Sequence, residues 1–146
     1  GIISPELHWY YDLNANVAQT IASGFFDSMS FYQKLSFEQQ QKLEQILHFF
    51  DLKEDKNKKL NTLSLGKQRL ALLARTIVKN PELLILDEPC QGLDVQQTKY
   101  FNRVVDDLCN SGHTLIYVGH FESQLPESLS HKLILEKGEI KNEKFQ

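Results

Sequence analysis

Apolar runs typical of strands and apolar stripes typical of helices follow one another through the second half of the chain. Residues 83–86 are four apolar residues in a row, as in a strand buried on both faces, and Pro89 prevents the strand from continuing. Residues 113–119 have the same character, and we expect a second buried strand there. An amphipathic helix separates the two runs, so the right-handed crossover rule predicts that the strands pair in parallel. The pattern indicates an α/β fold.

Three helices are predicted from apolar residues spaced three and four positions apart. Ser36 and Gln39 form a capping box before the first, and Asp94 can cap the third. Residues 51–59 mix both signs of charge and are interpreted as a solvated connector. Residues 133–140 predict a closing β-hairpin with a tight turn at Lys137 and Gly138. The predicted buried stripes are Leu43, Ile46, Leu47 and Phe50, then Leu70, Leu73, Ala74 and Ile77, then Phe101, Val104, Val105 and Leu108.

Two adjacent carboxylates, Asp87 and Glu88, directly follow the first predicted strand. In open α/β sheets, side chains do chemistry at the carboxyl ends of strands. One carboxylate can hold Mg²⁺ while the other polarises a nucleophile, which is the division of labour that phosphoryl transfer needs. An acidic turn after a strand is the alternative, and on this segment alone the two interpretations have similar weight.

A possible anion site lies at the start of the second predicted helix. Ser64 stands where an N-cap belongs, and Gly66 leaves backbone N–H groups open to a ligand. A hydroxyl, bare amides and the positive end of a helix suit a phosphate. Taken alone, an ordinary capped helix is the better interpretation of this piece.

Four segments together resemble the nucleotide-binding domain of the ATP-binding-cassette (ABC) ATPases. LSLGK at residues 63–67 matches the LSGGQ signature of that family, with Leu65 in place of a glycine and Lys67 in place of the glutamine. LLILDEP at 83–89 matches the Walker B strand and its catalytic glutamate. QGLD at 91–94 matches the D-loop, and LIYVGH at 115–120 matches the strand that ends in the switch histidine. The sequences of these motifs are most similar to those of the tandem-cassette proteins associated with molybdate transport.

The resemblance implies a P-loop NTPase-like partial domain. Residues 1–12 correspond to the Q-loop region, residues 13–80 to the helical subdomain with the signature, and residues 81–146 to the later half of a RecA-like parallel-sheet core with a terminal hairpin. No glycine-rich Walker A loop occurs in the sequence. We therefore expect the C-terminal portion of a larger cassette, inactive by itself. A protein that lacks Walker A altogether is the alternative.

The resemblance also implies which residues meet Mg²⁺ and the attacking water. Asp87 would hold Mg²⁺, Glu88 would orient or deprotonate the water, and His120 would donate to the γ-phosphate of ATP. Pro5 stands where the family has the Q-loop glutamine, so either Glu6 replaces that contact or the contact is missing.

A second cassette is implied as a partner, because the family sandwiches ATP between two head-to-tail cassettes. Ser64, Gly66 and Lys67 would meet the γ-phosphate of ATP held by the other cassette. Asp94 would lie across the interface, although capping its helix explains it adequately.

Composition narrows the function without naming it. The net charge of −3 argues against nucleic acid as a partner, since such proteins are normally basic. No apolar run approaches the ~20 residues of a membrane span, so membrane contact would be through a partner.

The resemblance favours the ATP-hydrolysing part of a cytoplasmic ABC transporter component, bound peripherally to a membrane permease that moves a small solute such as an oxyanion. A soluble tandem-cassette ATPase in regulation or repair and a non-hydrolysing interaction module are the alternatives.

Overall fold

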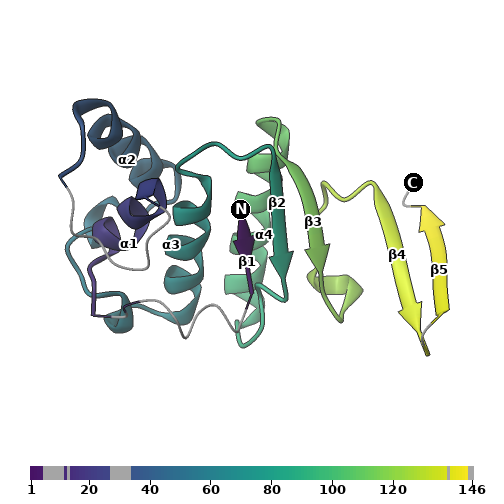
Figure 1. Cartoon of the computed structure of the whole chain (residues 1–146). Coiled ribbons are helices and arrows are strands. Elements are labelled where there is room, and N and C mark those ends of the chain that lie inside the picture. The colour runs from purple at the N-terminus through teal and green to yellow at the C-terminus, as the bar shows by residue number, and fades with distance from the viewer. Residues whose placement is uncertain (5–11, 13, 27–33, 138, 145–146) are drawn as a thin grey trace.

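The computed structural model describes residues 1–4, 12, 14–26, 34–137 and 139–144 (Figure 1). Glu6 and Pro5, named above for the Q-loop position, lie outside the described residues, and so does Gly138 of the predicted turn. No helix in the described ranges combines the length and the apolar character that crossing a membrane requires.

Three helices form the first part of the fold: α1 (Val17–Ser23), α2 (Phe37–Phe49) and α3 (Leu65–Ile77). The predicted capping box at Ser36 is confirmed, because its side chain accepts from the Gln39 N–H while Gln39 caps the Ser36 N–H in return. Asn16 caps α1 in the same way. The 3₁₀ turns η2 (Gly24–Phe26), η3 (Lys53–Asp55) and η4 (Leu60–Thr62) complete this part.

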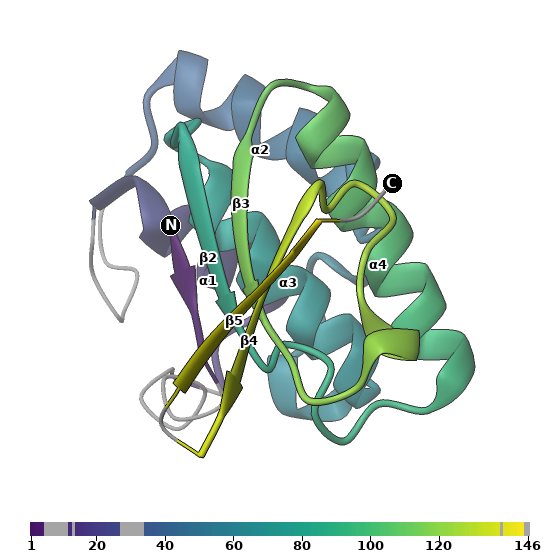
Figure 2. The same ribbon diagram turned by 90° about the vertical axis from the view of Figure 1, so that its right-hand side faces the viewer.

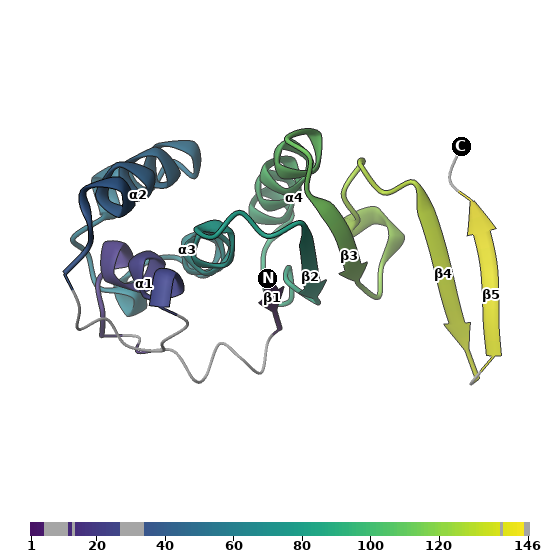
Figure 3. The same cartoon turned by 45° about the horizontal axis from the view of Figure 1, so that its top comes forward.

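A parallel sheet with strand order β1-β2-β3 follows, built from β1 (Ile2–Ile3), β2 (Leu83–Asp87) and β3 (Thr114–Val118). Parallel pairing of the two predicted strands is confirmed, with Asp87 in register with Val118. The connecting helix α4 (Val95–Asn110) begins at the predicted cap Asp94 and lies on one face of the sheet (Figure 3).

The prediction that residues 83–86 are buried on both faces is wrong, and so is the prediction of a buried strand at residues 113–119. Leu84 and Leu86 of β2 are fully buried, whereas Leu83 on the other face is exposed. In β3, Ile116 and Val118 are exposed on that same face. Successive strand residues point to opposite faces, and no helix of the described residues covers the second face (Figure 3).

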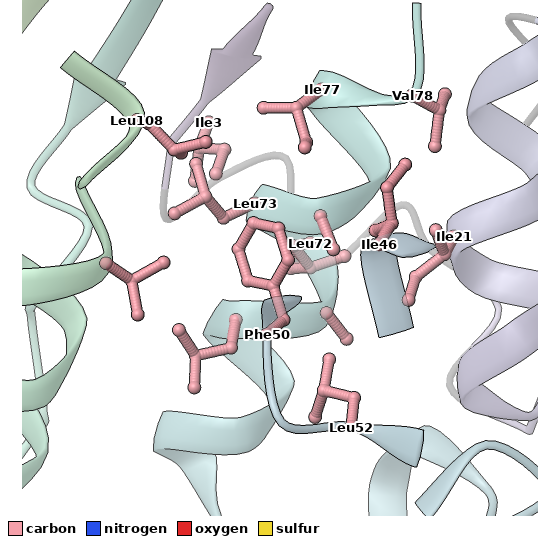
Figure 4. Close-up of a cluster of buried hydrophobic side chains, with 14 of the residues drawn as sticks. Ile3, Ile21, Ile46, Phe50, Leu52, Leu72, Leu73, Ile77, Val78 and Leu108 are labelled. Carbon is pink, nitrogen blue, oxygen red and sulfur yellow. The ribbon is translucent and has the colours of Figure 1, made fainter. Parts of the chain in front are cut away.

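The hydrophobic core joins the helical part to the covered face of the sheet. Phe50 and Leu52 lie among side chains from α2 and α3, and Leu108 of α4 and Ile3 of β1 lie beside Leu73 (Figure 4). All twelve residues of the three predicted stripes are buried, which confirms the helical periodicity.

The predicted hairpin consists of β4 (His131–Glu136) and β5 (Glu139–Lys144), paired antiparallel as a separate two-stranded sheet. It lies at the end of the molecule away from α1 and α2, and it faces the viewer in Figure 2. The 3₁₀ turn η5 (Glu122–Gln124) precedes it.

The prediction that residues 51–59 form a solvated connector is wrong at Asp55. The Asp55 side chain is 4% exposed, and its two carboxylate oxygens accept from Lys58 and Lys67. The buried Leu52 next to η3 holds this segment against the core, so a stretch of mixed charge carries a buried carboxylate paired with two partly exposed lysines.

Arg69 is likewise not the surface-paired residue that its place on an amphipathic helix suggests. Its side chain is buried in α3, and its Nε and Nη1 have no hydrogen-bond partner among the described residues. Burial lowers the pKa of this guanidinium from its usual value. Arg75, on the same helix, is half-buried and donates through Nε to the buried Ser23 hydroxyl at 2.9 Å.

Candidate active site and signature segment

Glu88 and His120 meet at the carboxyl ends of β2 and β3. The two strands run in parallel with Asp87 opposite Val118, so the residues that follow each strand emerge at the same edge. His120 Nε2 lies 2.6 Å from Glu88 Oε1, a hydrogen bond in which the imidazole N–H donates to the carboxylate. The structure thus brings together two of the predicted site residues, which are 32 positions apart in the sequence.

Glu88 is held in a conformation that side chains rarely adopt. Its φ is +45°, in the left-handed region. Its N–H donates to the Val118 carbonyl at 3.0 Å, and its own carbonyl accepts from Gln91 N–H at 3.1 Å. These bonds compensate a strain of about 1–3 kcal/mol, of the kind that clusters at functional sites. The Glu88 backbone is therefore held by β3 and by the turn that follows β2, and its carboxylate is held by the hydrogen bond from His120.

Asp87, the last residue of β2, has a half-buried side chain next to this pair. Among the residues that the structure describes, none donates a hydrogen bond to its carboxylate. No group of three or more His, Cys, Asp or Glu suited to a metal ion occurs among the described residues. A single carboxylate such as Asp87 still fits Mg²⁺, which is commonly bound by one or two carboxylates together with substrate phosphates and water.

A pocket of about 260 Å³ opens beside Glu88 and His120. Glu88 and His120 line it together with Gly92, Cys90 and Tyr117. The Tyr117 hydroxyl donates to Cys90 Sγ at 3.3 Å, and burial raises the pKa of the Cys90 thiol. Cys90 is therefore a buried protonated thiol, as expected for a structural cysteine.

The signature-like segment lies at the start of α3, where the predicted N-cap Ser64 is confirmed. The Ser64 hydroxyl accepts from the Lys67 N–H at 3.4 Å, which leaves other N–H groups of the first turn available. Gly66 is packed against α4, since a Cβ there would lie 3.2 Å from Cγ and Cδ of Gln97. A larger residue at position 66 would therefore have to displace the Gln97 side chain.

The Lys67 side chain points toward the connector. Its Nζ donates to Asp55 Oδ2, while Lys58 Nζ donates to Asp55 Oδ1 at 2.6 Å. The two lysines lower the pKa of the Asp55 carboxyl, and burial opposes them with a smaller effect. Sequence reasoning missed Asp55, because one acid in a stretch of mixed charge carries no signal of burial.

Asp94 caps α4 by accepting from the Gln97 N–H at 2.8 Å. The turn before it contains Gly92 at φ +81°, and Leu65 of the signature-like segment packs over that glycine. The D-loop-like and signature-like segments are therefore in direct contact within the chain.

The two groups of predicted site residues do not share a cavity. Ser64, Gly66 and Lys67 line a second pocket of about 260 Å³ between the start of α3 and α4. Neither Glu88 nor His120 lines that pocket. Within the described residues, the Glu88–His120 pair and the possible anion site at the N-terminus of α3 are therefore separate.

Comparison with known proteins identifies the relatives of this chain. The family model described as "ABC transporter" matches residues 9–91, more than half of the chain. The ABC transporter ATP-binding protein ModF of Escherichia coli is 41% identical over 91% of this chain and 28% of its own length. The spermidine/putrescine import ATP-binding protein PotA of Bacillus thuringiensis is 32% identical over 91% of this chain and 40% of its own length. The chain therefore spans well under two thirds of the length of these relatives. The ModF match confirms the resemblance of its motifs to the tandem-cassette proteins.

Solved structures give the same fold. An ATP-binding cassette of an ABC transporter, MJ1267, superposes with a TM-score of 0.82 at 19% identity, covering 99% of this chain and 61% of that one. A nucleotide-free ATP-binding cassette from an ABC transporter superposes with a TM-score of 0.82 at 21% identity, covering 100% of this chain and 62% of that one. The predicted P-loop NTPase-like α/β fold is confirmed, and the chain belongs to the ABC transporter family of ATP-binding proteins.

Proposed function

We propose that this chain forms part of a cassette that hydrolyses ATP, with the Glu88–His120 pair at its reaction centre. The observation that carries the proposal is the 2.6 Å contact between His120 Nε2 and Glu88 Oε1 at the end of two parallel strands. A carboxylate placed in this way can orient and deprotonate a water. The imidazole N–H that it holds can turn from Glu88 to a phosphate oxygen as negative charge develops there. This arrangement argues against a non-hydrolysing interaction module, the third interpretation of the sequence.

Asp87 is the residue that would hold Mg²⁺ with ATP. Its carboxylate stands next to Glu88 and accepts no hydrogen bond from the described residues. Bound Mg²⁺ would neutralise charge on the phosphates, as in other phosphoryl transfers. Glu6 remains the candidate for the Q-loop contact.

A second cassette is the partner that this arrangement supports. The acid-histidine pair and the start of α3 line different pockets, so one chain does not place both around a single phosphate. In a head-to-tail pair, Ser64 and Gly66 would meet the γ-phosphate of ATP held by the other cassette. Asp94 would lie at the same interface while capping α4.

The cassette is proposed to lie on the cytoplasmic face of the membrane, bound to a membrane permease. The energy of ATP hydrolysis would drive solute transport through that permease. The name of the PotA relative, an import ATP-binding protein, supports this class of function. The similarity of the motifs to those of tandem-cassette proteins associated with molybdate transport favours a molybdate-type oxyanion as the solute. A soluble tandem-cassette ATPase in regulation or repair is the second candidate, and co-purification of a permease distinguishes the two.

Glu88→Gln in a protein that contains the complete cassette tests the reaction centre. The amide keeps the shape of the side chain but loses its basicity, so we expect ATP binding to persist while steady-state turnover falls at least about 100-fold. Glu82→Gln is the matched control, because Glu82 is an exposed glutamate at the other end of β2. Unchanged turnover in Glu88→Gln would contradict the assignment.

A further inference from the structure

The two positions at which this chain departs from the LSGGQ signature both have partners within the chain. Leu65, in place of a glycine, packs over Gly92, and Lys67, in place of the glutamine, binds Asp55. The second contact changes the charge presented at the start of α3, the segment assigned above to the phosphate of a second cassette.

Asp55 is held rigidly by its own backbone. Its N–H donates to the Leu52 carbonyl at 3.1 Å, and its carbonyl accepts from the Lys58 N–H at 2.9 Å. Leu52 is fully buried in the core. The carboxylate therefore has a fixed position, and the flexible lysine side chains come to it.

Each oxygen of the Asp55 carboxylate holds one ammonium group. Lys58 donates to Oδ1 and Lys67 to Oδ2. The carboxylate is 4% exposed, whereas the Lys67 side chain is 46% exposed. A charge-assisted hydrogen bond to a buried carboxylate is among the stronger polar contacts in a protein, so Lys67 is retained there although solvent is close by.

We propose that Asp55 is a positioning residue that keeps the Lys67 ammonium away from the nucleotide of the second cassette. An incoming γ-phosphate at the start of α3 then meets the Ser64 hydroxyl and backbone N–H groups, and not a mobile cation. Departure of phosphate after hydrolysis is not opposed by an extra ionic bond. This inference rests on the proposed ATPase function and concerns the same site.

Steady-state ATP hydrolysis by the complete cassette tests the inference through four variants: Asp55→Asn, Lys67→Gln, the double variant, and Glu54→Gln. Glu54 is exposed and adjacent to Asp55, so Glu54→Gln removes one negative charge without touching the pair. Asp55→Asn releases Lys67, and we expect the ATP concentration at half-maximal rate to fall about five-fold while kcat also falls, because the freed ammonium can pair with phosphate. The same substitution in the Lys67→Gln background should have no such effect on half-saturation.

The outcomes separate this inference from the function on which it rests. A wild-type cassette without ATP binding or turnover would overturn both. An active wild type in which Asp55→Asn leaves half-saturation unchanged, or shifts it equally with and without Lys67, would overturn the positioning role alone. Should Asp55→Asn fail to fold, Lys67→Gln still decides. A rise of about three-fold or more in half-saturating ATP would show that Lys67 itself binds phosphate and would overturn the inference, and a smaller change supports retention by Asp55.

Discussion

Leu65 and Gly92 connect the signature-like turn to the D-loop-like turn. Leu65 Cδ2 lies 3.1 Å from the position that a Cβ on Gly92 would occupy, and Gly92 has φ +81°. The backbone conformation therefore favours glycine, and a Cβ at this position would require Leu65 to shift by a few tenths of an ångström. The start of α3 and the turn after β2 are consequently packed as one unit.

Gly92→Ala should destabilise the protein by two effects. The left-handed backbone costs about 1–2 kcal/mol for a residue with a Cβ, and the close approach of Leu65 adds about 1 kcal/mol of overpacking. The free energy of unfolding in urea measures the sum.

Gly112→Ala is a matched control for that experiment. Gly112 has φ +104°, but nothing lies within 4 Å of the position of its Cβ. It should show the backbone effect without the contact. Equal losses in the two variants would contradict a packing role for Leu65.

His120→Ala should reduce turnover without affecting stability. The His120 side chain is 69% exposed, so little burial is lost, while Glu88 loses its hydrogen-bond partner. We expect turnover of the complete cassette to fall about 100-fold with an unchanged melting temperature. His48→Ala, at an exposed position in α2, is the control. A melting temperature that falls in step with activity would instead indicate a structural histidine.

The Asp55 ion pair should make stability depend on pH in the acid range. The pKa of Asp55 is lowered in the folded state, chiefly by its hydrogen bonds with Lys58 and Lys67. The contribution to the free energy of unfolding is therefore present above the ordinary carboxyl pKa of 3.8 and is lost as pH falls through the lower folded value.

Asp55→Asn removes this contribution, which we place at about 1–2 kcal/mol because both lysines are partly solvated. Urea unfolding at pH 7 and near pH 3 should show a difference between wild type and Asp55→Asn that narrows in acid. Glu54→Gln should keep the wild-type acid dependence. A difference that is constant with pH would mean that packing, and not charge, accounts for the effect of the substitution.

Local signals predicted much of this structure, and long-range contacts account for what they missed. The caps at Ser36, Ser64 and Asp94 follow from hydrogen bonds within one helical turn, which a sequence displays directly. The meeting of Glu88 and His120 was accessible because parallel strands end at a common edge.

The burial of polar groups could not be predicted from the local sequence. Asp55 and Arg69 look like ordinary surface residues in their local sequence, and their burial depends on segments that arrive from elsewhere in the chain. The exposure of Leu83 and Ile116 likewise depends on what covers the sheet, because an apolar strand has the same sequence whether one face or both are covered.

Cys90 should react with thiol reagents much more slowly than Cys109, the other cysteine of the chain. Burial raises the pKa of the Cys90 thiol, and only a thiolate attacks such reagents efficiently. Cys109 is half-buried and offers easier access. We expect labelling by a chromogenic disulfide at pH 8, resolved by peptide mass spectrometry, to be at least about ten-fold slower at Cys90. Denaturation in urea should bring the two rates together, because it removes burial from both residues. Equal rates in the folded protein would mean that the pocket beside Glu88 admits the reagent and that Cys90 is accessible from the reaction centre.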